Sequence, residues 1–311
     1  MPLLRINATP IGLALHDSPQ CTMQRLARLA QGSGPIIIMI HGFKYDPMNR
    51  IHCPHQKLFC AKSDDAWPRA LGFGVETENS GLGIAFGWSA RGSLQEVHMR
   101  ARETAQNLAR LIRLIIRTAP HRRIHAIAHS LGSEVLLNVL PLIPAFGLNR
   151  VILLTGASYA ARADRMLATP AGRTAEVLNV TARGNDLFDV GFERLVPPEQ
   201  PGDGAIGRGL WGRNVITLQL DCPKALEALA DLGFVVAPSR SPISHWSTYA
   251  RAGALEFYAH AMRHPEALPF ALLRTKLPQE SAQHFSRLWV REAHHQSKTS
   301  SRFTQRLKSR I

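Results

Sequence analysis

Cysteines are few in this 311-residue sequence, and none of the four is spaced as in a Cys-x-x-Cys pair. Four cysteines are too few for a disulfide framework in a chain of this length, so only a single Cys53–Cys60 disulfide stays open. Histidines flank Cys53 at positions 52 and 55, but no second ligand cluster follows at a zinc-like spacing. We therefore predict an ordinary loop here and no metal site.

Long hydrophobic runs are also missing. The longest candidates are residues 35–40 and residues 135–148, and Asn138, Pro141 and Pro144 interrupt the second of them. A membrane-spanning helix needs about 20 consecutive apolar residues. The N-terminus lacks the basic start and the uninterrupted apolar block of a secretory signal. The sequence thus predicts a cytoplasmic protein without a transmembrane segment.

Acidic residues are scarce, since 23 Asp and Glu against 37 Lys and Arg give a formal net charge of +14. Such an excess can indicate a nucleic acid or an anionic surface as partner. Much of it, however, is arginine dispersed along helix-like sequence, and residues 291–311 add six basic side chains against the single acid Glu292. We expect one domain over residues 1–290, a mobile basic tail over residues 291–311, and no specific nucleic-acid binding.

Short β-branched runs alternate with longer amphipathic stretches. This alternation is typical of parallel strands joined by crossover helices, and it predicts an α/β domain with a mostly parallel central sheet. The clearest helix covers residues 93–118, and Ser93 with Glu96 forms a capping-box pair at its start. A second helix is predicted over 131–143. The predicted strands are 36–41, 83–88, 124–128, 150–155, 177–182 and 214–220, with edge strands within 3–15.

The strongest chemical signal is Ser130, which stands between the apolar strand 124–128 and the helix that begins at Leu131. A nucleophilic serine on such a turn has a strained backbone, and only small side chains fit two residues to either side. Ala128 and Gly132 occupy these two positions. The N-terminus of the following helix also points toward the serine, which favours developing negative charge.

This segment and the run Ile36-Ile37-Ile38-Met39-Ile40-His41-Gly42-Phe43 resemble the α/β-hydrolase superfamily. The strand ending in Trp88, followed by an arginine-rich helix, further resembles a poorly characterised bacterial branch of it. The resemblance covers roughly residues 34–260. It implies helices on both faces of the sheet and a hydrolytic reaction class, but no particular substrate. It also implies that the backbone N–H groups of Phe43 and Leu131 form an oxyanion hole.

Two other serines compete for the role of nucleophile. Ser89 has Arg91 two positions later, where a nucleophile turn needs a small residue, so steric crowding argues against Ser89. Ser158 has small neighbours, but it follows the next strand and precedes a weaker helix. In the superfamily that the sequence resembles, the His-Gly turn, one more strand and helix, and the nucleophile follow in succession, and this order favours Ser130.

A serine hydroxyl needs a base that removes its proton, and a third group must hold that base in one tautomer. His245 lies in a polar loop soon after the last strand, whereas His260 and His264 lie within or at the end of the next helix. We predict His245 as the base. For the acid we favour Asp186, which directly follows the Gly184-Asn185 turn, and Asp189 is the alternative.

These residues predict a serine hydrolase that cleaves a carboxylic ester of a small-molecule acyl substrate without a cofactor. Thioesters and amides would use the same groups. The main alternative is a catalytically silent protein of this fold that binds an anionic surface or nucleic acid through its basic residues. A partner-binding module with an incidental triad is a third possibility.

Overall fold

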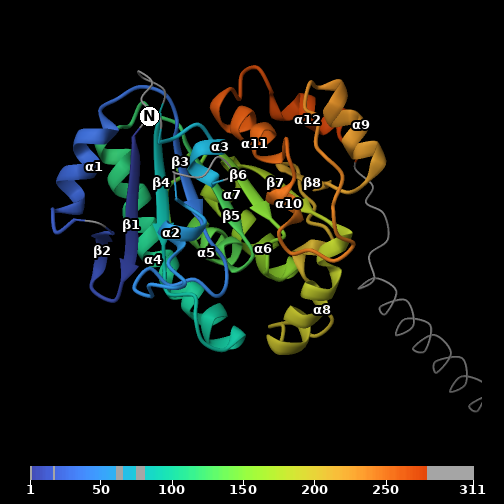
Figure 1. Cartoon of the computed structure of the whole chain (residues 1–311), viewed down its shortest axis with the longest axis horizontal. Helices are drawn as coiled ribbons and strands as arrows, with labels where there is room; N and C mark the ends of the chain where they lie inside the picture. Colours follow the sequence, from blue (N-terminus) through green and yellow to red (C-terminus); the bar gives the residue numbers. More distant parts are fainter. Residues whose placement is uncertain (1, 17, 61–65, 75–80, 279–311) are drawn as a thin grey trace, which may run out of the picture.

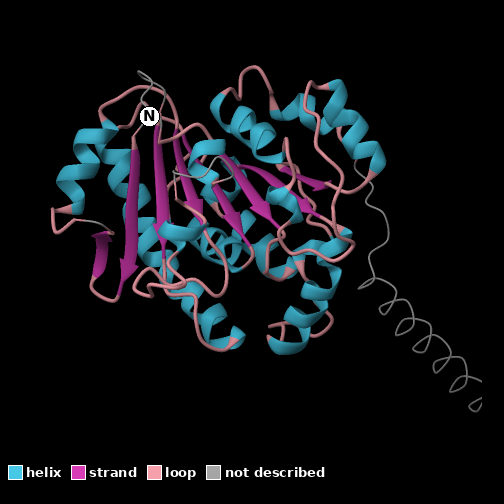
Figure 2. Ribbon diagram, viewed as in Figure 1, coloured by secondary structure: helices cyan, strands magenta, loops and turns pink. Residues whose placement is uncertain are grey.

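The structure, a computed structural model, describes residues 2–16, 18–60, 66–74 and 81–278. Its centre is one eight-stranded sheet in the order β2-β1-β4-β3-β5-β6-β7-β8 (Figures 1 and 2). Only the β1–β2 pair is antiparallel, which confirms the predicted, mostly parallel sheet. The strands are β1 Leu3–Thr9, β2 Gly12–Leu15, β3 Ile36–Ile40, β4 Leu82–Gly87, β5 Ile124–His129, β6 Arg150–Leu154, β7 Glu176–Thr181 and β8 Val215–Gln219.

Helices cover both faces of this sheet, as the resemblance implied (Figure 2). Apolar residues of α1, α4, α5 and α6 belong to the core on one face, and those of α3, α9, α11 and α12 to the core on the other. The α-helices are α1 Thr22–Ala30, α2 Pro54–Lys57, α3 Trp67–Ala70, α4 Leu94–Thr118, α5 Leu131–Val139, α6 Ala160–Leu167, α7 Pro170–Thr174, α8 Asp186–Leu195, α9 Pro223–Asp231, α10 Ser247–Ala250, α11 Ala254–Arg263 and α12 Phe270–Lys276.

Strand β3 illustrates why its sequence is apolar throughout. Ile36, Ile38 and Ile40 pack into the core beneath α4 and α5, while Ile37 and Met39 pack into the core on the opposite face. Successive side chains of a strand point to opposite faces, so a strand covered on both sides has no polar position. The five-residue run is fully buried for this reason.

The two helices next to the predicted nucleophile start where the sequence indicated. Ser93 Oγ accepts the N–H of Glu96 (3.3 Å) and Glu96 Oε2 accepts the N–H of Ser93 (2.9 Å), so the capping box of α4 is confirmed. Helix α5 begins at Leu131 but ends at Val139, four residues before the predicted end. Pro141 explains the difference, because a proline cannot donate the helical hydrogen bond, and the chain passes into a 3-10 turn over Leu140–Leu142.

The cysteines do not pair. All four are free, and the Sγ atom of buried Cys53 lies 3.6 Å from His16 Nε2. His55 Nε2 contacts Asn7 Oδ1 at 2.8 Å. No helix among the described residues is long and apolar enough to cross a bilayer. The predicted basic tail, residues 291–311, lies outside the described residues.

Candidate active site

Ser130 has an unusual backbone conformation at the junction of β5 and α5. Its φ and ψ are 54° and −126°, and a positive φ is uncommon for a residue with a side chain. Three hydrogen bonds hold this geometry: the Ser130 N–H donates to Leu154 O (3.0 Å), and Ser130 O accepts from Ser133 N–H (2.9 Å) and Ala157 N–H (3.1 Å). Strain maintained in this way is typical of a functional position.

Two glycines allow the chain to pack tightly around Ser130. A Cβ atom on Gly132 would lie 2.6 Å from His41 O, and a Cβ atom on Gly42 would lie 2.7 Å from Ser130 Cβ. Neither distance is compatible with a side chain. The His-Gly turn after β3 is therefore in direct contact with the serine. The sequence analysis expected a small residue at position 132, and the structure shows that His41 O leaves no room for a larger one.

His41 fixes this turn. The N–H of Trp88 donates to His41 Nε2 (3.0 Å), so the ring proton is on Nδ1, which donates to Gly42 O (2.9 Å). Trp88 Nε1–H donates to His41 O (3.0 Å). Burial lowers the pKa of His41 to about 4 and keeps the ring neutral. The ring thus holds the backbone leading into Phe43, whereas Leu131 is the first residue of α5.

His245 is held next to the segment that carries Ser130, because its backbone is bound by the residue that precedes the serine. His245 O accepts hydrogen bonds from His129 Nε2–H (3.0 Å) and from Thr155 Oγ1–H (3.1 Å). The His129 and His245 ring centroids are 4.5 Å apart. Within the described residues Ser130 Oγ does not donate to His245, and such bonds often tighten only when substrate binds.

Asn185, the residue before the predicted acid Asp186, lies within hydrogen-bond distance of His245 Nδ1. Asn185 Oδ1 lies 2.6 Å from Nδ1, and Asn185 Nδ2 donates to Asp189 Oδ1 at 2.9 Å. Since the Asn185 amide nitrogen donates to Asp189, the amide oxygen faces His245, so Nδ1 carries the proton and Nε2 presents its lone pair.

A 3-10 turn over Arg183–Asn185 follows β7 directly. The turn brings its last residue, Asn185, to face the histidine loop. Asp186 is buried in the first turn of α8. Asp189, the alternative acid, is also buried there and reaches the histidine only through Asn185.

Burial sets the protonation of this cluster. It lowers the pKa of His245 well below its usual value, and neighbouring His129 and Lys44 lower it further. The pKa of His129 falls to about 4 for the same principal reason. The pKa of Asp189 is raised by burial and by the nearby carboxylates of Asp186 and Glu193. Both histidines are therefore neutral near pH 7.

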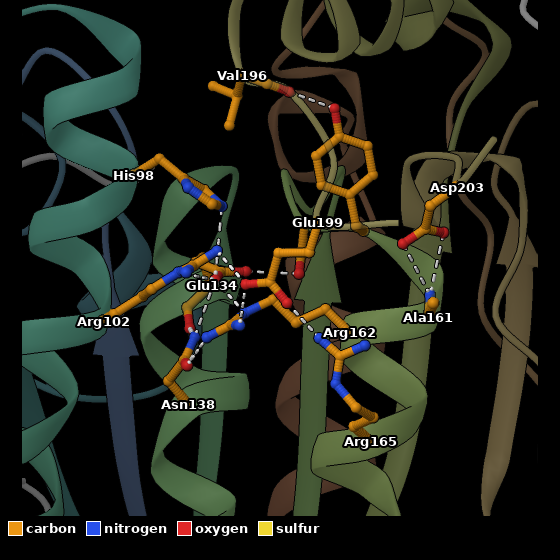
Figure 3. A network of polar contacts seen from close by, with 12 residues as sticks. His98, Arg102, Glu134, Asn138, Ala161, Arg162, Arg165, Val196, Glu199 and Asp203 are labelled. Carbon is orange, nitrogen blue, oxygen red and sulfur yellow. Dashed lines mark hydrogen bonds and ion pairs between the residues drawn. The ribbon is translucent and has the colours of Figure 1, made fainter. Parts of the chain in front are cut away.

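The two competing serines occupy other networks. Ser89 Oγ donates to Asp46 Oδ2 at 2.8 Å. Ser158 is fully buried, and its Oγ donates to Glu134 Oε2 at 2.5 Å. Figure 3 shows Glu134 among side chains of three helices, with Arg162 Nε at 2.7 Å and Arg102 Nε at 3.4 Å from its Oε1 atom. Ser158 therefore helps to satisfy a buried carboxylate.

Four exposed apolar side chains lie in the two segments that carry His245 and Phe188, a feature that the sequence analysis missed. The Phe188 ring stacks on the His245 ring with centroids 4.8 Å apart and an interplanar angle of 25°. Leu187, Ile243 and Trp246 are each more than half exposed. We call these four residues the apolar rim.

Comparison with known proteins agrees with this fold. Residues 20–151 match the model of a family described as an α/β hydrolase of unknown function, DUF900. No curated protein matches the sequence. Among solved structures, Trichoderma reesei cutinase in complex with a phosphonate inhibitor is 13% identical, with a TM-score of 0.28, over 47% of this chain and 61% of that one.

Phospholipase PlaB from Legionella pneumophila in complex with thio-NAD is 17% identical, with a TM-score of 0.29, over 47% of this chain and 37% of that one. The chain thus spans less than two thirds of the length of either solved structure. The matched family segment runs from just before α1 to the start of β6 and includes the turn at Ser130. With this match and its mostly parallel sheet covered on both faces, the chain has an α/β-hydrolase fold.

Proposed function

We propose that the protein is a serine hydrolase in which Ser130 attacks a carboxylic ester and His245 acts as the general base. One observation carries this proposal: the strained Ser130, with φ of 54°, directly follows His129, which binds the backbone of a histidine whose Nδ1 is engaged by Asn185. That arrangement leaves Nε2 as the only ring nitrogen able to accept a proton. A nucleophile, a base and an orienting group are the components that acyl transfer requires.

In the proposed reaction, His245 Nε2 takes the hydroxyl proton as Ser130 Oγ bonds to the ester carbonyl carbon. The carbonyl oxygen becomes an oxyanion, and the backbone N–H groups of Phe43 and Leu131 stabilise it. Removal of one such donor costs about 3 to 4 kcal/mol in known enzymes. Protonated His245 then gives its proton to the leaving alcohol, and water releases the acyl group from Ser130 by the same steps.

The orienting group proposed here is neutral. Asn185 fixes the tautomer of His245 by accepting a hydrogen bond from Nδ1–H. Asp189 accepts a hydrogen bond from the Asn185 amide nitrogen and so holds the amide in this orientation. An amide stabilises the imidazolium less than a carboxylate does, and burial raises the pKa of Asp189, so the role of this pair is to orient the His245 ring. Gly207 gives Asp189 its space, because a Cβ atom there would lie 2.0 Å from Asp189 Oδ2.

The apolar rim supports an acyl substrate with a hydrophobic chain. Phe188 stacks on His245, and its neighbour Leu187 is 54% exposed. An exposed apolar surface therefore adjoins the proposed general base. Burying that surface against a substrate chain would contribute about 25 cal/mol per Å². Longer acyl chains should therefore bind more tightly.

The experiment for this function is hydrolysis of p-nitrophenyl acetate, butyrate and octanoate by the wild type and by Ser130→Ala. Saturable turnover with KM falling as the chain lengthens supports the proposal. Absence of turnover on all three esters would favour the catalytically silent alternative, in which the basic residues bind an anionic surface.

Substitution of Asn185 by alanine should lower kcat by about 10²- to 10⁴-fold with little change in KM. The reason is that His245 Nδ1 loses its partner at 2.6 Å, so the wrong tautomer becomes populated. Asp186→Asn is the matched control and should retain most of the activity. Steady-state kinetics of both variants, with melting temperatures as a check on folding, decide the point. If Asp186→Asn were the inactive variant, the orienting group would be the carboxylate that the sequence favoured.

A further inference from the structure

A pocket of about 410 Å³ lies at the amino ends of the central strands. It is bordered by the turn after α1, by the residues that lead into β3 and β5, and by the end of α11. Ser130 follows the carboxyl end of β5, so the whole strand separates this pocket from the candidate active site. In Figure 1 the parallel strands begin at the upper edge of the sheet, and the lining residues that lead into β3 and β5 belong to that edge.

Positive charge dominates the lining of this pocket. Three arginines, Arg122, Arg123 and Arg263, line it together with one carboxylate, that of Glu266. The buried Arg122 guanidinium donates only to backbone carbonyls, those of Leu29, Ala30, Gly34 and Pro35, at 2.8–3.3 Å. Among the described residues no carboxylate lies within 4.0 Å of Arg122, so peptide dipoles alone offset its charge. A site of this kind attracts anions.

His125 contributes a buried donor without a partner. Its Nδ1 accepts the N–H of Arg150 at 3.2 Å, so the ring proton is on Nε2. Nε2 has no hydrogen-bond partner, although the side chain is 1% exposed and lines the pocket. An unsatisfied buried donor is costly, and such groups in native proteins call for an explanation. Burial, with Arg150 and Arg123 nearby, lowers the pKa of His125 to about 3, so the ring stays a neutral donor.

The one acid at this site is loosely held. Glu266 Oε2 lies 3.8 Å from Arg123 Nη1, and Glu266 Oε1 lies 3.8 Å from His264 Nδ1. The Arg123 and Glu266 side chains are 59% and 67% exposed. Ion pairs of this length and exposure contribute little stability. A stronger anion could therefore displace Glu266 from Arg123 at small cost.

We propose that this pocket binds a small phosphate monoester, with phosphate oxygens accepting from His125 Nε2–H and pairing with Arg123 and Arg263. A phosphate group offers several acceptor oxygens in different directions, which suits donors that come from β5, its preceding turn and α11. The volume exceeds that of the phosphate group, which leaves room for the organic part. The depth of His125, at 1% exposure, favours a small molecule over a polymer backbone.

The test is calorimetric titration of the full-length protein with inorganic phosphate and with glycerol 3-phosphate at constant ionic strength. Wild type should bind one equivalent saturably, and the organic phosphate should bind more tightly. Arg123→Gln should weaken binding about tenfold or more, and Glu266→Gln should strengthen it. Arg173→Gln, which removes an exposed arginine that does not line the pocket, should leave binding unchanged.

Two further variants separate this pocket from the active site. His125→Phe should abolish tight binding, whereas Lys44→Gln, which removes the cation near His245, should have no effect. If His125→Phe does not fold, Arg123→Gln and Glu266→Gln decide. The proposal is overturned if wild type does not bind phosphate saturably, if Arg123→Gln binds like wild type, or if Lys44→Gln removes the binding.

Discussion

Ser130→Ala should lower kcat for p-nitrophenyl butyrate by about 10⁴- to 10⁶-fold. The loss is this large because no other group within the site can form the acyl intermediate, and what remains is binding and oxyanion stabilisation. Folding should survive, since alanine keeps the Cβ atom that contacts Gly42 and the backbone hydrogen bonds that hold the turn. The measurements are kcat, KM and the melting temperature.

Ser89→Ala is the matched control for this variant. Ser89 follows β4, which β3 separates from β5, and its hydroxyl bonds to Asp46, so its removal should leave kcat within about twofold of wild type. The assignment fails if Ser130→Ala retains wild-type turnover, or if Ser158→Ala, which disturbs the buried Glu134 network, is the variant that loses catalysis while folded.

His245→Ala should be nearly as damaging, with kcat reduced by about 10³- to 10⁶-fold. The variant loses the Nε2 base but keeps the backbone carbonyl that His129 and Thr155 bind, so the loop should stay in position. His260→Ala, on α11, is the control and should be active. Equal activity of His245→Ala and wild type would refute the base assignment.

The pH profile of kcat/KM gives an independent check on His245. Its pKa lies well below the usual value because of burial, so the ring stays neutral and able to accept a proton below pH 6.5. Activity should therefore persist below pH 6.5 and fall only as the pH drops through the lowered pKa. Asn185→Asp would place a carboxylate beside Nδ1, stabilise the imidazolium and move this acid limb to higher pH.

The sheet could be predicted because its strands are buried on both faces. The run Ile36–Ile40 has no polar position, and the same holds for the buried strand Ile124–His129 apart from its two histidines. The tight turn at Ser130 was predictable for a related reason: Gly132 is small because His41 O lies where its side chain would be. Local sterics of this kind leave a clear trace in the sequence.

The residue that contacts His245 Nδ1 could not be predicted, because it depends on where the turn after β7 ends. A 3-10 turn over Arg183–Asn185 brings the amide to the histidine, and a turn one residue longer would have presented Asp186. One signal did exist. Asn185 and Asp189 are four residues apart, the spacing at which side chains on a helix meet. His129 and Thr155 bind the backbone of His245 from distant parts of the chain, so no local sequence pattern indicates these contacts.

The central claim, that Ser130 is an activated nucleophile, is tested most directly with a fluorophosphonate probe followed by peptide mass spectrometry. Such probes react quickly only with a serine that has a base and an oxyanion hole beside it. We predict one adduct per chain, on the peptide that contains Ser130, and its loss in both Ser130→Ala and His245→Ala. An adduct on Ser158 or Ser89, or no adduct on the folded wild-type protein, would contradict the claim.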